Sequence, residues 1–298
     1  MSYHIVSIDT PQCFLGLRDK QLICNTDEGK RQLPLEDVAS IIVTSFSATI
    51  HSHLLLGAAK QGVALIICES YKPVALLLPA NRSTDTLLTR AVLNLSEKVR
   101  STLWQKTVDA KCQNQVALAR SIASEDARIH VLESLATSKK KHKEAFCARS
   151  YWQVLGKAIG DDTFTRDRHR KGLNSLLNYG YAVLLARVLQ NLYAVGLDPT
   201  FGLSHATRER SVPLAYDLME PFRPCVDLKV YQWARTNPPP WEVSKTYKKH
   251  VISFLQEKIR WRRSLLEVEN VIEGAIRSFR KAVLEGKPQL YQPWILKN

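Results

Sequence analysis

Apolar residues in the first eighty positions alternate with polar ones or form short runs, which is typical of β-strands. His4–Ile8 alternates, whereas Val63–Cys68 and Val74–Leu78 are compact apolar runs that predict buried strands. His51–Gln61 has helical spacing instead and stops at Gly62, a residue that commonly ends helices. Further short strands are expected at Cys13–Leu17, Gln21–Cys24 and Ile41–Val43. The pattern therefore predicts a small β-rich region that carries one short helix.

The pattern changes after residue 80. Asn81–Asp85 is polar and follows a proline, so it is the best candidate for a linker, and from Leu87 onward the apolar spacing is helical. We therefore expect an α+β fold with a β-rich domain at residues 1–80, a linker at 81–90 and a larger all-α domain at 91–298. Helices are expected at Leu87–Lys111, Asn114–Thr137, Glu144–Ala158, Gly172–Ala194, Val251–Gln256 and Glu267–Leu284.

The excess positive charge belongs to the second part of the chain. The 298 residues contain 42 Lys and Arg against 28 Asp and Glu, a net charge of +14. Residues 1–80 contain 6 basic and 7 acidic residues, a net of −1, so the rest of the chain carries +15. A domain this basic suggests a polyanionic partner such as nucleic acid. Charge alone leaves open the alternative of a merely soluble basic protein.

Cysteine spacing and hydropathy exclude other classes of protein. No two of the six cysteines have the spacing of a zinc knuckle, so we expect small buried thiols in a reducing compartment. The N-terminus lacks the basic and apolar regions of a signal peptide, and no apolar run approaches the ~20 residues that span a bilayer. The sequence therefore predicts a soluble cytoplasmic protein that has no contact with membranes.

One candidate for chemistry is Glu144, in the segment KHKEAFCARSYW. If this segment is a helix, Ala148, Tyr151 and Leu155 share the face of Glu144. A carboxylate on such an apolar face should be partly buried, and it then needs a cation, a metal ion or a hydrogen-bond donor. An ordinary salt bridge to Arg149 or to a nearby lysine remains the alternative.

A second candidate lies at residues 202–227, GLSHATRERSVPLAYDLMEPFRPCVD. Asp217 and Glu220 are three positions apart and would lie on adjacent turns of one helix, with His205 before them and Asp227 after them. Imidazole and carboxylate together suit Mn²⁺ or Mg²⁺. A capped helix with solvated acidic side chains remains the alternative for each of these residues taken singly.

Basic residues gather in four segments of the second part of the chain. These are SKKKHK at 138–143, RDRHRK at 166–171, TYKKH at 246–250 and RWRR at 260–263. Aromatic residues lie among them or close by: Trp241, Tyr247 and Trp261. Basic and stacking groups together suit a phosphate backbone and unpaired bases, although each run alone is equally typical of a solvated helix face.

Three motifs together resemble a known family, the integrases and endonucleases of CRISPR spacer acquisition. EAFCARSYW at Glu144–Trp152 is similar to the glutamate-containing helix of that family, and LNSLLNYGYAVLLARV at Leu173–Val188 is similar to its Asn-Tyr-Gly-Tyr helix. The segment at 202–227 resembles the family in its histidine and in the run DLMEPFRP, whose form looks nearest to the type II branch. The order of the motifs and the β-then-α organisation also match, over nearly the whole chain.

The resemblance implies a metal-dependent DNA integrase of CRISPR adaptation, a system of antiviral defence. Glu144, His205 and Glu220 would be the catalytic residues and would hold Mg²⁺ or Mn²⁺, with Asp217 beside them to orient His205 or bind a second ion. A DNA 3′-hydroxyl would attack a phosphodiester of the CRISPR repeat and insert the spacer by transesterification. The residues placed to contact DNA would be Arg149, Asn178, Tyr181, Arg208, Arg223, Lys248 and Lys249.

The resemblance also implies partners. These are double-stranded DNA, both prespacer and CRISPR repeat, a second copy of the chain, and a small ferredoxin-like adaptation subunit. The near-neutral residues 1–80 would suit the homodimer interface. Two other functions stay open. One is a metal-dependent endonuclease with water as the nucleophile, and the other is a non-catalytic DNA-binding protein in which the three residues are structural.

Overall fold

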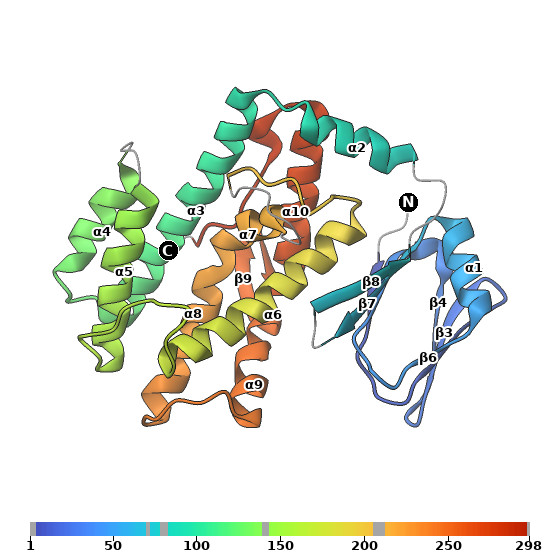
Figure 1. Ribbon diagram of the computed structural model, residues 1–298, viewed down its shortest axis with the longest axis horizontal. Helices are drawn as coiled ribbons and strands as arrows, with labels where there is room; N and C mark the ends of the chain where they lie inside the picture. Colours follow the sequence, from blue (N-terminus) through green and yellow to red (C-terminus); the bar gives the residue numbers. More distant parts are fainter. Residues whose placement is uncertain (1–3, 70–71, 78–82, 139–142, 205–211, 297–298) are drawn as a thin grey trace.

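The computed structural model describes residues 4–69, 72–77, 83–138, 143–204 and 212–296. The N-terminal part is rich in β-strands and the remainder is mostly helical, and the two parts lie next to each other (Figure 1). This organisation confirms the α+β class expected from the hydrophobic pattern.

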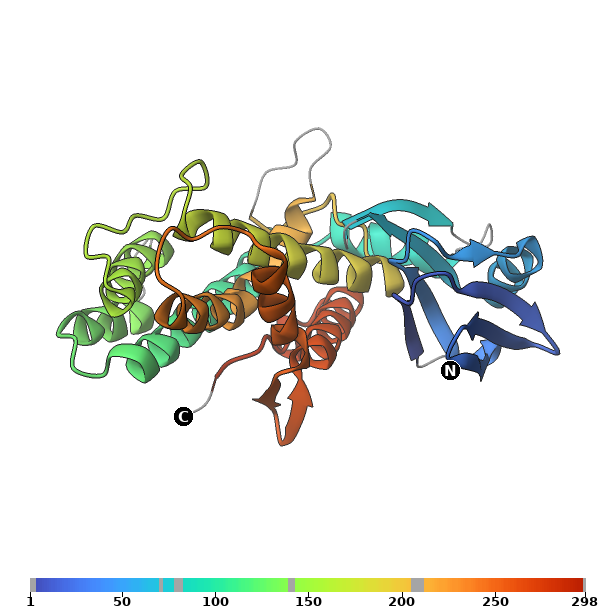
Figure 2. The same cartoon turned by 90° about the horizontal axis from the view of Figure 1, so that it is seen from below.

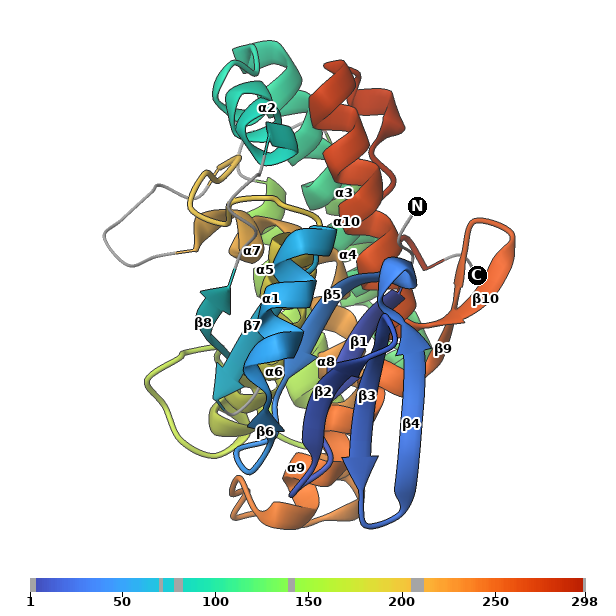
Figure 3. The same ribbon diagram turned by 90° about the vertical axis from the view of Figure 1, so that its right-hand side faces the viewer.

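Two four-stranded sheets make up the N-terminal part (Figure 3). The first has the order β1-β5-β7-β8, in which β1, β5 and β7 are parallel and β8 is antiparallel to β7. The second has the order β4-β3-β2-β6. The strands are β1 His4–Ile8, β2 Phe14–Arg18, β3 Gln21–Thr26, β4 Gly29–Pro34, β5 Val38–Val43, β6 Thr49–Ile50, β7 Ala64–Glu69 and β8 Lys72–Leu77.

One apolar core joins these sheets to helix α1 (Ser52–Gln61) through residues such as Leu15, Ile41 and Leu54. The β2–β3 hairpin turns at Asp19 and Lys20, which have φ of 50° and 62°, the backbone of a tight two-residue hairpin turn. The sequence pattern did not predict strand β4, because this edge strand is mostly exposed and has no alternation of apolar residues.

The helical part differs from the expectation at several places. The helices at 213–219 and 223–236 were not expected, the chain leaves the helix at 94–96 and at 124–127, and most of Val251–Gln256 forms a 3₁₀ turn. Helix α2 begins at Ser83, inside the range expected as a linker. Helix α3 is continuous through the break expected between Lys111 and Asn114. Two strands, β9 and β10, form a hairpin that projects from the helices (Figure 2). The elements are α2 Ser83–Leu93, α3 Glu97–Ala123, α4 Arg128–Thr137, α5 Lys143–Ile159, α6 Leu173–Ala194, α7 Pro213–Met219, the 3₁₀ turn η2 Glu220–Phe222, α8 Arg223–Thr236, α9 Lys245–Ile252, η3 Ser253–Gln256, β9 Lys258–Trp261, β10 Ser264–Glu267, α10 Val268–Glu285 and η4 Pro288–Leu290.

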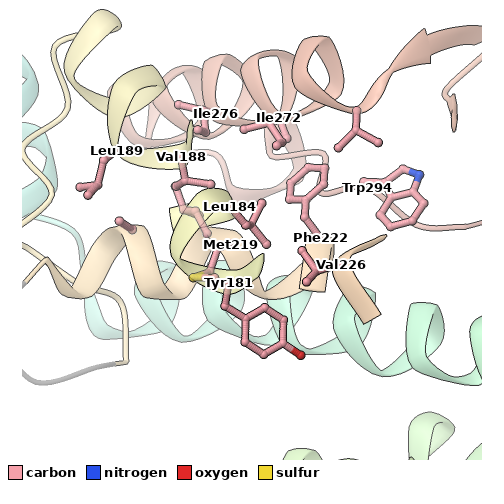
Figure 4. Packing of buried hydrophobic residues seen from close by; sticks show 14 of the residues in the cluster. Tyr181, Leu184, Val188, Leu189, Met219, Phe222, Val226, Ile272, Ile276 and Trp294 are labelled. Atoms are coloured by element: carbon pink, nitrogen blue, oxygen red, sulfur yellow. The ribbon is translucent and has the colours of Figure 1, made fainter. Parts of the chain in front are cut away.

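Two apolar clusters hold the helices together. The larger surrounds α6, where Leu184 and Val188 pack with Ile272 and Ile276 of α10 and with residues of α7 and α8 (Figure 4). The smaller joins α3, α4 and α5 through residues such as Cys112, Leu132 and Tyr151. Helix α3 also contacts η2 and α8, so it connects the two clusters. The candidate site lies at this junction.

Helix α6 also contacts the N-terminal part. Tyr193 packs against Ile42, Ile66 and Cys68 of the first sheet, and the Gln190 amide lies 3.4 Å from the Cys68 sulfur. Within the described part of the chain, every helix is too short or too polar to cross a bilayer.

Candidate metal centre

Three charged side chains from three different elements meet at the junction of the two helical clusters. The Nζ atom of Lys111, on α3, lies 2.6 Å from Oε1 of Glu144, in the first turn of α5, and 2.6 Å from Oε2 of Glu220, in η2. The side chain of Glu220 is 4% exposed and that of Glu144 is 33% exposed. The fold therefore brings together two of the acids that the motifs predicted as metal ligands, and a lysine ammonium joins them.

Proline placement positions Glu220 at a tight turn of the chain. Helix α7 ends at Met219 and α8 begins at Arg223, and Glu220 and Phe222 between them keep helical angles. Pro221 has no N–H to donate, and its ring crowds the carbonyl four residues earlier, so a regular α-helix cannot continue through it. The chain forms the short 3₁₀ turn η2 instead, which points Glu220 toward α3.

Asn114 fastens this turn to α3. Its side-chain amide is fully buried and donates to the carbonyl of Pro221 at 2.7 Å and to that of Trp294 at 3.1 Å. Its oxygen accepts from the backbone N–H of Leu296 at 2.7 Å. Asn114 lies one turn after Lys111 on the same helix, so α3 fixes both the backbone beside Glu220 and its carboxylate.

The Glu220 carboxylate has a second cationic neighbour, Arg223. The Nε atom of Arg223 lies 2.9 Å from Oε1 of Glu220, and the guanidinium lies 4.5 Å from the centre of the Tyr181 ring. Burial lowers the pKa of Arg223, but Glu220, Tyr181 and Asp227 more than offset this and hold it above its ordinary value. The buried glutamate is thus flanked by two cations.

The same balance acts on Lys111. Burial lowers the pKa of this lysine, but the negative charges of Glu220 and Glu144 outweigh the burial and place the pKa above its ordinary value. Lys111 is therefore a charged ammonium in a buried position, which is tolerated in proteins only when the charge is paired.

Asp217 anchors the chain just before His205. Its carboxylate is fully buried, and Oδ2 accepts the backbone N–H of Leu203 at 2.5 Å and of Ser204 at 3.2 Å. His205 itself lies outside the described residues, so its predicted role as a ligand stays a prediction. Between the two roles expected of Asp217, these contacts favour support of the histidine segment over binding of a second ion.

A buried polar network stands behind the site. Asp227 is fully buried, and its carboxylate accepts from the hydroxyl of Tyr151 at 2.8 Å and from that of Tyr181 at 2.5 Å. Burial raises the pKa of Asp227 to about 6, although the two tyrosines, Arg223 and Arg166 act in the opposite direction. The network ties α5, α6 and α8 together, and it also holds the ring on which Arg223 stacks.

The two carboxylates fit a single divalent ion. Because Oε1 of Glu144 and Oε2 of Glu220 each lie 2.6 Å from one nitrogen, they are at most about 5.2 Å apart. Two oxygens on opposite sides of one Mg²⁺ ion are ~4 Å apart, so a small rearrangement of either side chain would bring both onto one ion. Among the described residues, which do not include His205, no group of three or more His, Cys, Asp or Glu side chains is arranged to hold a metal.

The residues predicted to contact DNA differ in how exposed their side chains are. Arg149, Lys248 and Lys249 are exposed. Asn178 is half-buried, where it accepts from Arg166 at 2.7 Å and donates to the carbonyl of Arg168 at 2.9 Å. Arg208 lies outside the described residues.

Tyr181 and Arg223 point inward. Tyr181 is 7% exposed and donates to Asp227, whereas the side chain of Arg223 is 23% exposed and pairs with Glu220. Their predicted contact with DNA stays a prediction.

Lys111 and Asn114 were not singled out from the sequence, and the pairing of Tyr151 and Tyr181 with Asp227 was not foreseen either. A signal for the first two was present, because Thr107, Lys111 and Asn114 recur at helical spacing among buried apolar residues of α3. A row of polar residues on the buried face of a helix indicates partners elsewhere in the fold, although it does not identify them.

A family model and a curated relative both match this chain over most of its length. The model of the family described as "CRISPR associated protein Cas1" matches residues 6–238. The CRISPR-associated endonuclease Cas1 of Neisseria meningitidis serogroup C (strain 8013) is 31% identical over 288 residues, which cover 95% of this chain and 93% of the relative.

Two solved structures share the fold over essentially the whole chain. One, described as "Casposase bound to integration product", has a TM-score of 0.75 at 20% identity and covers 98% of this chain and 99% of its own. The other, from the "Partial Cas6-RT-Cas1–Cas2 complex", has a TM-score of 0.77 at 14% identity and covers 100% of both chains. At these identities the likeness shows the fold alone.

Proposed function

The chain belongs to the Cas1 family of CRISPR-associated proteins, as its three motifs indicated, and from that premise we propose that it is a metal-dependent DNA integrase that inserts spacer DNA into a CRISPR array. The observation that carries the proposal is the meeting of Glu144 and Glu220, whose oxygens lie 2.6 Å from one common point, the Lys111 ammonium. Glutamates 76 positions apart in the sequence would have no reason to converge on one cation if both were solvated.

Glu144, Glu220 and His205 would hold the ion. When bound, a divalent ion supplies positive charge that polarises a phosphate and lowers the pKa of a hydroxyl beside it. Carboxylate oxygens suit Mg²⁺ and Mn²⁺, and an imidazole favours Mn²⁺.

The proposed reaction conserves the number of phosphodiester bonds. The 3′-oxygen of the incoming DNA forms a bond to a phosphorus of the repeat, and the bond from that phosphorus to its own 3′-oxygen breaks. The proton of the attacking hydroxyl is lost and the departing 3′-oxygen gains one. No external energy is needed, so the protein has to position two DNA ends and neutralise charge in the transition state.

The described residues would provide that positioning. Asp217 fixes the segment that leads to His205, and Asn114 fixes the turn that carries Glu220. Arg223 is held between Glu220 and the Tyr181 ring, where its charge adds to the positive potential around the site. Exposed basic residues such as Arg149 and Lys248 would contact the DNA backbone.

Partners follow from the same proposal. The structural neighbours include a casposase bound to an integration product and a complex that contains Cas1 and Cas2. This supports double-stranded DNA as the substrate and a small partner subunit as part of the assembly. We also propose a homodimer formed through the near-neutral β-rich part, because a surface without excess positive charge suits contact between two copies.

Glu144→Ala tests the proposal. The variant should lose Mn²⁺-dependent joining of a short duplex to repeat-containing DNA, because one of the carboxylates that hold the ion is gone. Binding of DNA in a gel-shift assay should persist. Glu133→Ala is the matched control, because Glu133 also pairs with a basic side chain, Arg120 at 2.6 Å, but lies on α4 and contributes nothing to the site. Full joining by Glu144→Ala would refute the assignment.

A metal-dependent endonuclease is the second candidate, because the Neisseria meningitidis relative is named an endonuclease. The same ligands would then serve water as the nucleophile. Cleavage of DNA without any joined product, in the presence of the partner subunit, would favour this function over integration.

A further inference from the structure

The proposed mechanism gives no role to Lys111, although its side chain lies between the two glutamates. Its ammonium lies 2.6 Å from an oxygen of Glu144 and of Glu220, the two predicted metal ligands that the structure describes, and the residue is only 8% exposed. Each of these two glutamates therefore contacts the lysine. A buried lysine that bridges two carboxylates occupies the space to which those carboxylates would direct an ion.

We propose that Lys111 is a positioning residue that holds Glu144 and Glu220 together before the ion binds and is displaced from them when it does. The inference rests on the proposed function, because it takes the two glutamates as metal ligands. A divalent ion bonded to both oxygens would lie close to the ammonium, and the two positive charges would repel. The lysine and the ion therefore compete for the two carboxylates.

The ammonium offsets the repulsion between the two carboxylates while no ion is bound. Without a cation, two carboxylates about 5 Å apart in a largely buried site repel each other, and one of them would rotate away or take up a proton. Arg223 neutralises part of the charge of Glu220, and within the described part of the chain it forms no ion pair with Glu144. Lys111 supplies the missing charge, and its flexible four-carbon stem allows it to withdraw when the ion arrives.

A consequence follows for the affinity of the ion. The ion must displace a charged competitor, so the wild-type protein binds Mn²⁺ more weakly than the same carboxylates would without the lysine. Replacement of Lys111 by methionine keeps the length and packing of the stem and removes the charge. A purely structural loss would weaken Mn²⁺ binding, whereas loss of a charged competitor that the ion has to displace outweighs the lost positioning and tightens the site.

The test measures Mn²⁺ binding to the full-length protein by electron paramagnetic resonance of the free ion, with folding checked by thermal melting. Lys111→Met should bind Mn²⁺ at least tenfold more tightly than the wild type. Lys229→Met is the matched control, since Lys229 is also 8% exposed and pairs with a single carboxylate, Glu257, at 2.5 Å. This control should bind Mn²⁺ as the wild type does.

Mn²⁺ binding to Glu144→Ala shows whether a negative result refutes the role of Lys111 or the metal site itself. If this variant loses the Mn²⁺ binding seen in the wild type, but Lys111→Met binds no more tightly than wild type, the role of Lys111 is refuted and the metal site stands. If no Mn²⁺ binding depends on Glu144, the proposed metal site falls and this inference falls with it.

A measurement on the wild-type protein covers the case in which Lys111→Met does not fold. In a crystal structure with Mn²⁺ bonded to Glu144 and Glu220, Nζ of Lys111 should lie beyond hydrogen-bond distance from at least one of the two carboxylates. Retention of both contacts beside the bound ion would overturn the proposal.

Discussion

Gly180 lies in the Asn-Tyr-Gly-Tyr stretch of α6, where two other helices approach the backbone closely. A Cβ added at Gly180 would stand 2.4 Å from Cγ1 of Val226 on α8 and 3.2 Å from Cγ2 of Val251 on α9. Carbon atoms in ordinary contact are ~3.5–4.0 Å apart, so α8 would have to move by about 1 Å. Val226 is fully buried and β-branched, so its side chain cannot rotate out of the way.

The magnitude of Gly180→Ala is set by two opposing effects. Alanine in the interior of a helix is about 1 kcal/mol more favourable than glycine. Overpacking a buried contact costs about 1–3 kcal/mol, and the short distance to a stiff side chain places this site at the upper end. We expect the free energy of unfolding to fall by about 2 kcal/mol, which urea denaturation followed by circular dichroism would measure.

A double-mutant cycle tests the cause. Val226→Ala removes the methyl group that the alanine side chain introduced by Gly180→Ala would meet. Gly180→Ala should therefore cost at least about 1 kcal/mol less in the Val226→Ala background than in the wild type. Because Asp227 follows Val226 and accepts from Tyr181, the single variant should also slow DNA joining. A Gly180→Ala protein as stable as the wild type, or costs that simply add in the double variant, would refute the reasoning.

Two further predictions concern buried carboxylates. The raised pKa of Asp227, about 6 against an ordinary 3.8, means that the folded protein retains a proton that the unfolded chain has lost between these pH values. The free energy of unfolding should therefore fall by about 3 kcal/mol through this group as pH rises from about 3 to 7, and Asp227→Asn should lack that decline. Equal pH dependence in both proteins, measured by denaturant titration, would contradict this prediction. Asp217→Asn replaces the charged carboxylate that accepts the backbone N–H groups of Leu203 and Ser204 with a weaker acceptor. The joining rate should therefore drop about tenfold while DNA binding is retained. A wild-type joining rate would show that this anchor is dispensable.

The helices that carry the site follow closely from sequence patterns, whereas the contacts between them do not. Helical spacing located α5 and α6 to within two residues at each end, and the motifs identified Glu144 and Glu220. Lys111 precedes Glu144 by 33 positions, and only tertiary packing brings the two together. Local periodicity carries no information about which buried polar groups meet.

Packing also explains the elements that the pattern placed wrongly. The polar residues around Lys111 and Asn114 predicted a break in the chain, but both side chains find buried partners, so α3 continues through them. The basic run at 260–263 gave no strand pattern, but it forms part of the β9–β10 hairpin, and its turn residue Arg262 has a φ of 55°. Trp261 of that hairpin packs where a Cβ on Gly274 would lie, 2.4 Å from its ring. A contact of this kind with α10 is not visible in a local pattern.

Strand joining with a chemically defined DNA end tests the central claim most directly. The wild-type protein, its partner subunit and Mn²⁺ would be incubated with repeat-containing DNA and a labelled duplex that ends either in a 3′-hydroxyl or in a 3′-deoxy terminus. A transesterase predicts a covalent product that carries the label only when the 3′-hydroxyl is present, and none with Glu144→Ala. Cleaved repeat DNA without labelled product, for both duplexes, would contradict integration and show that water is the nucleophile.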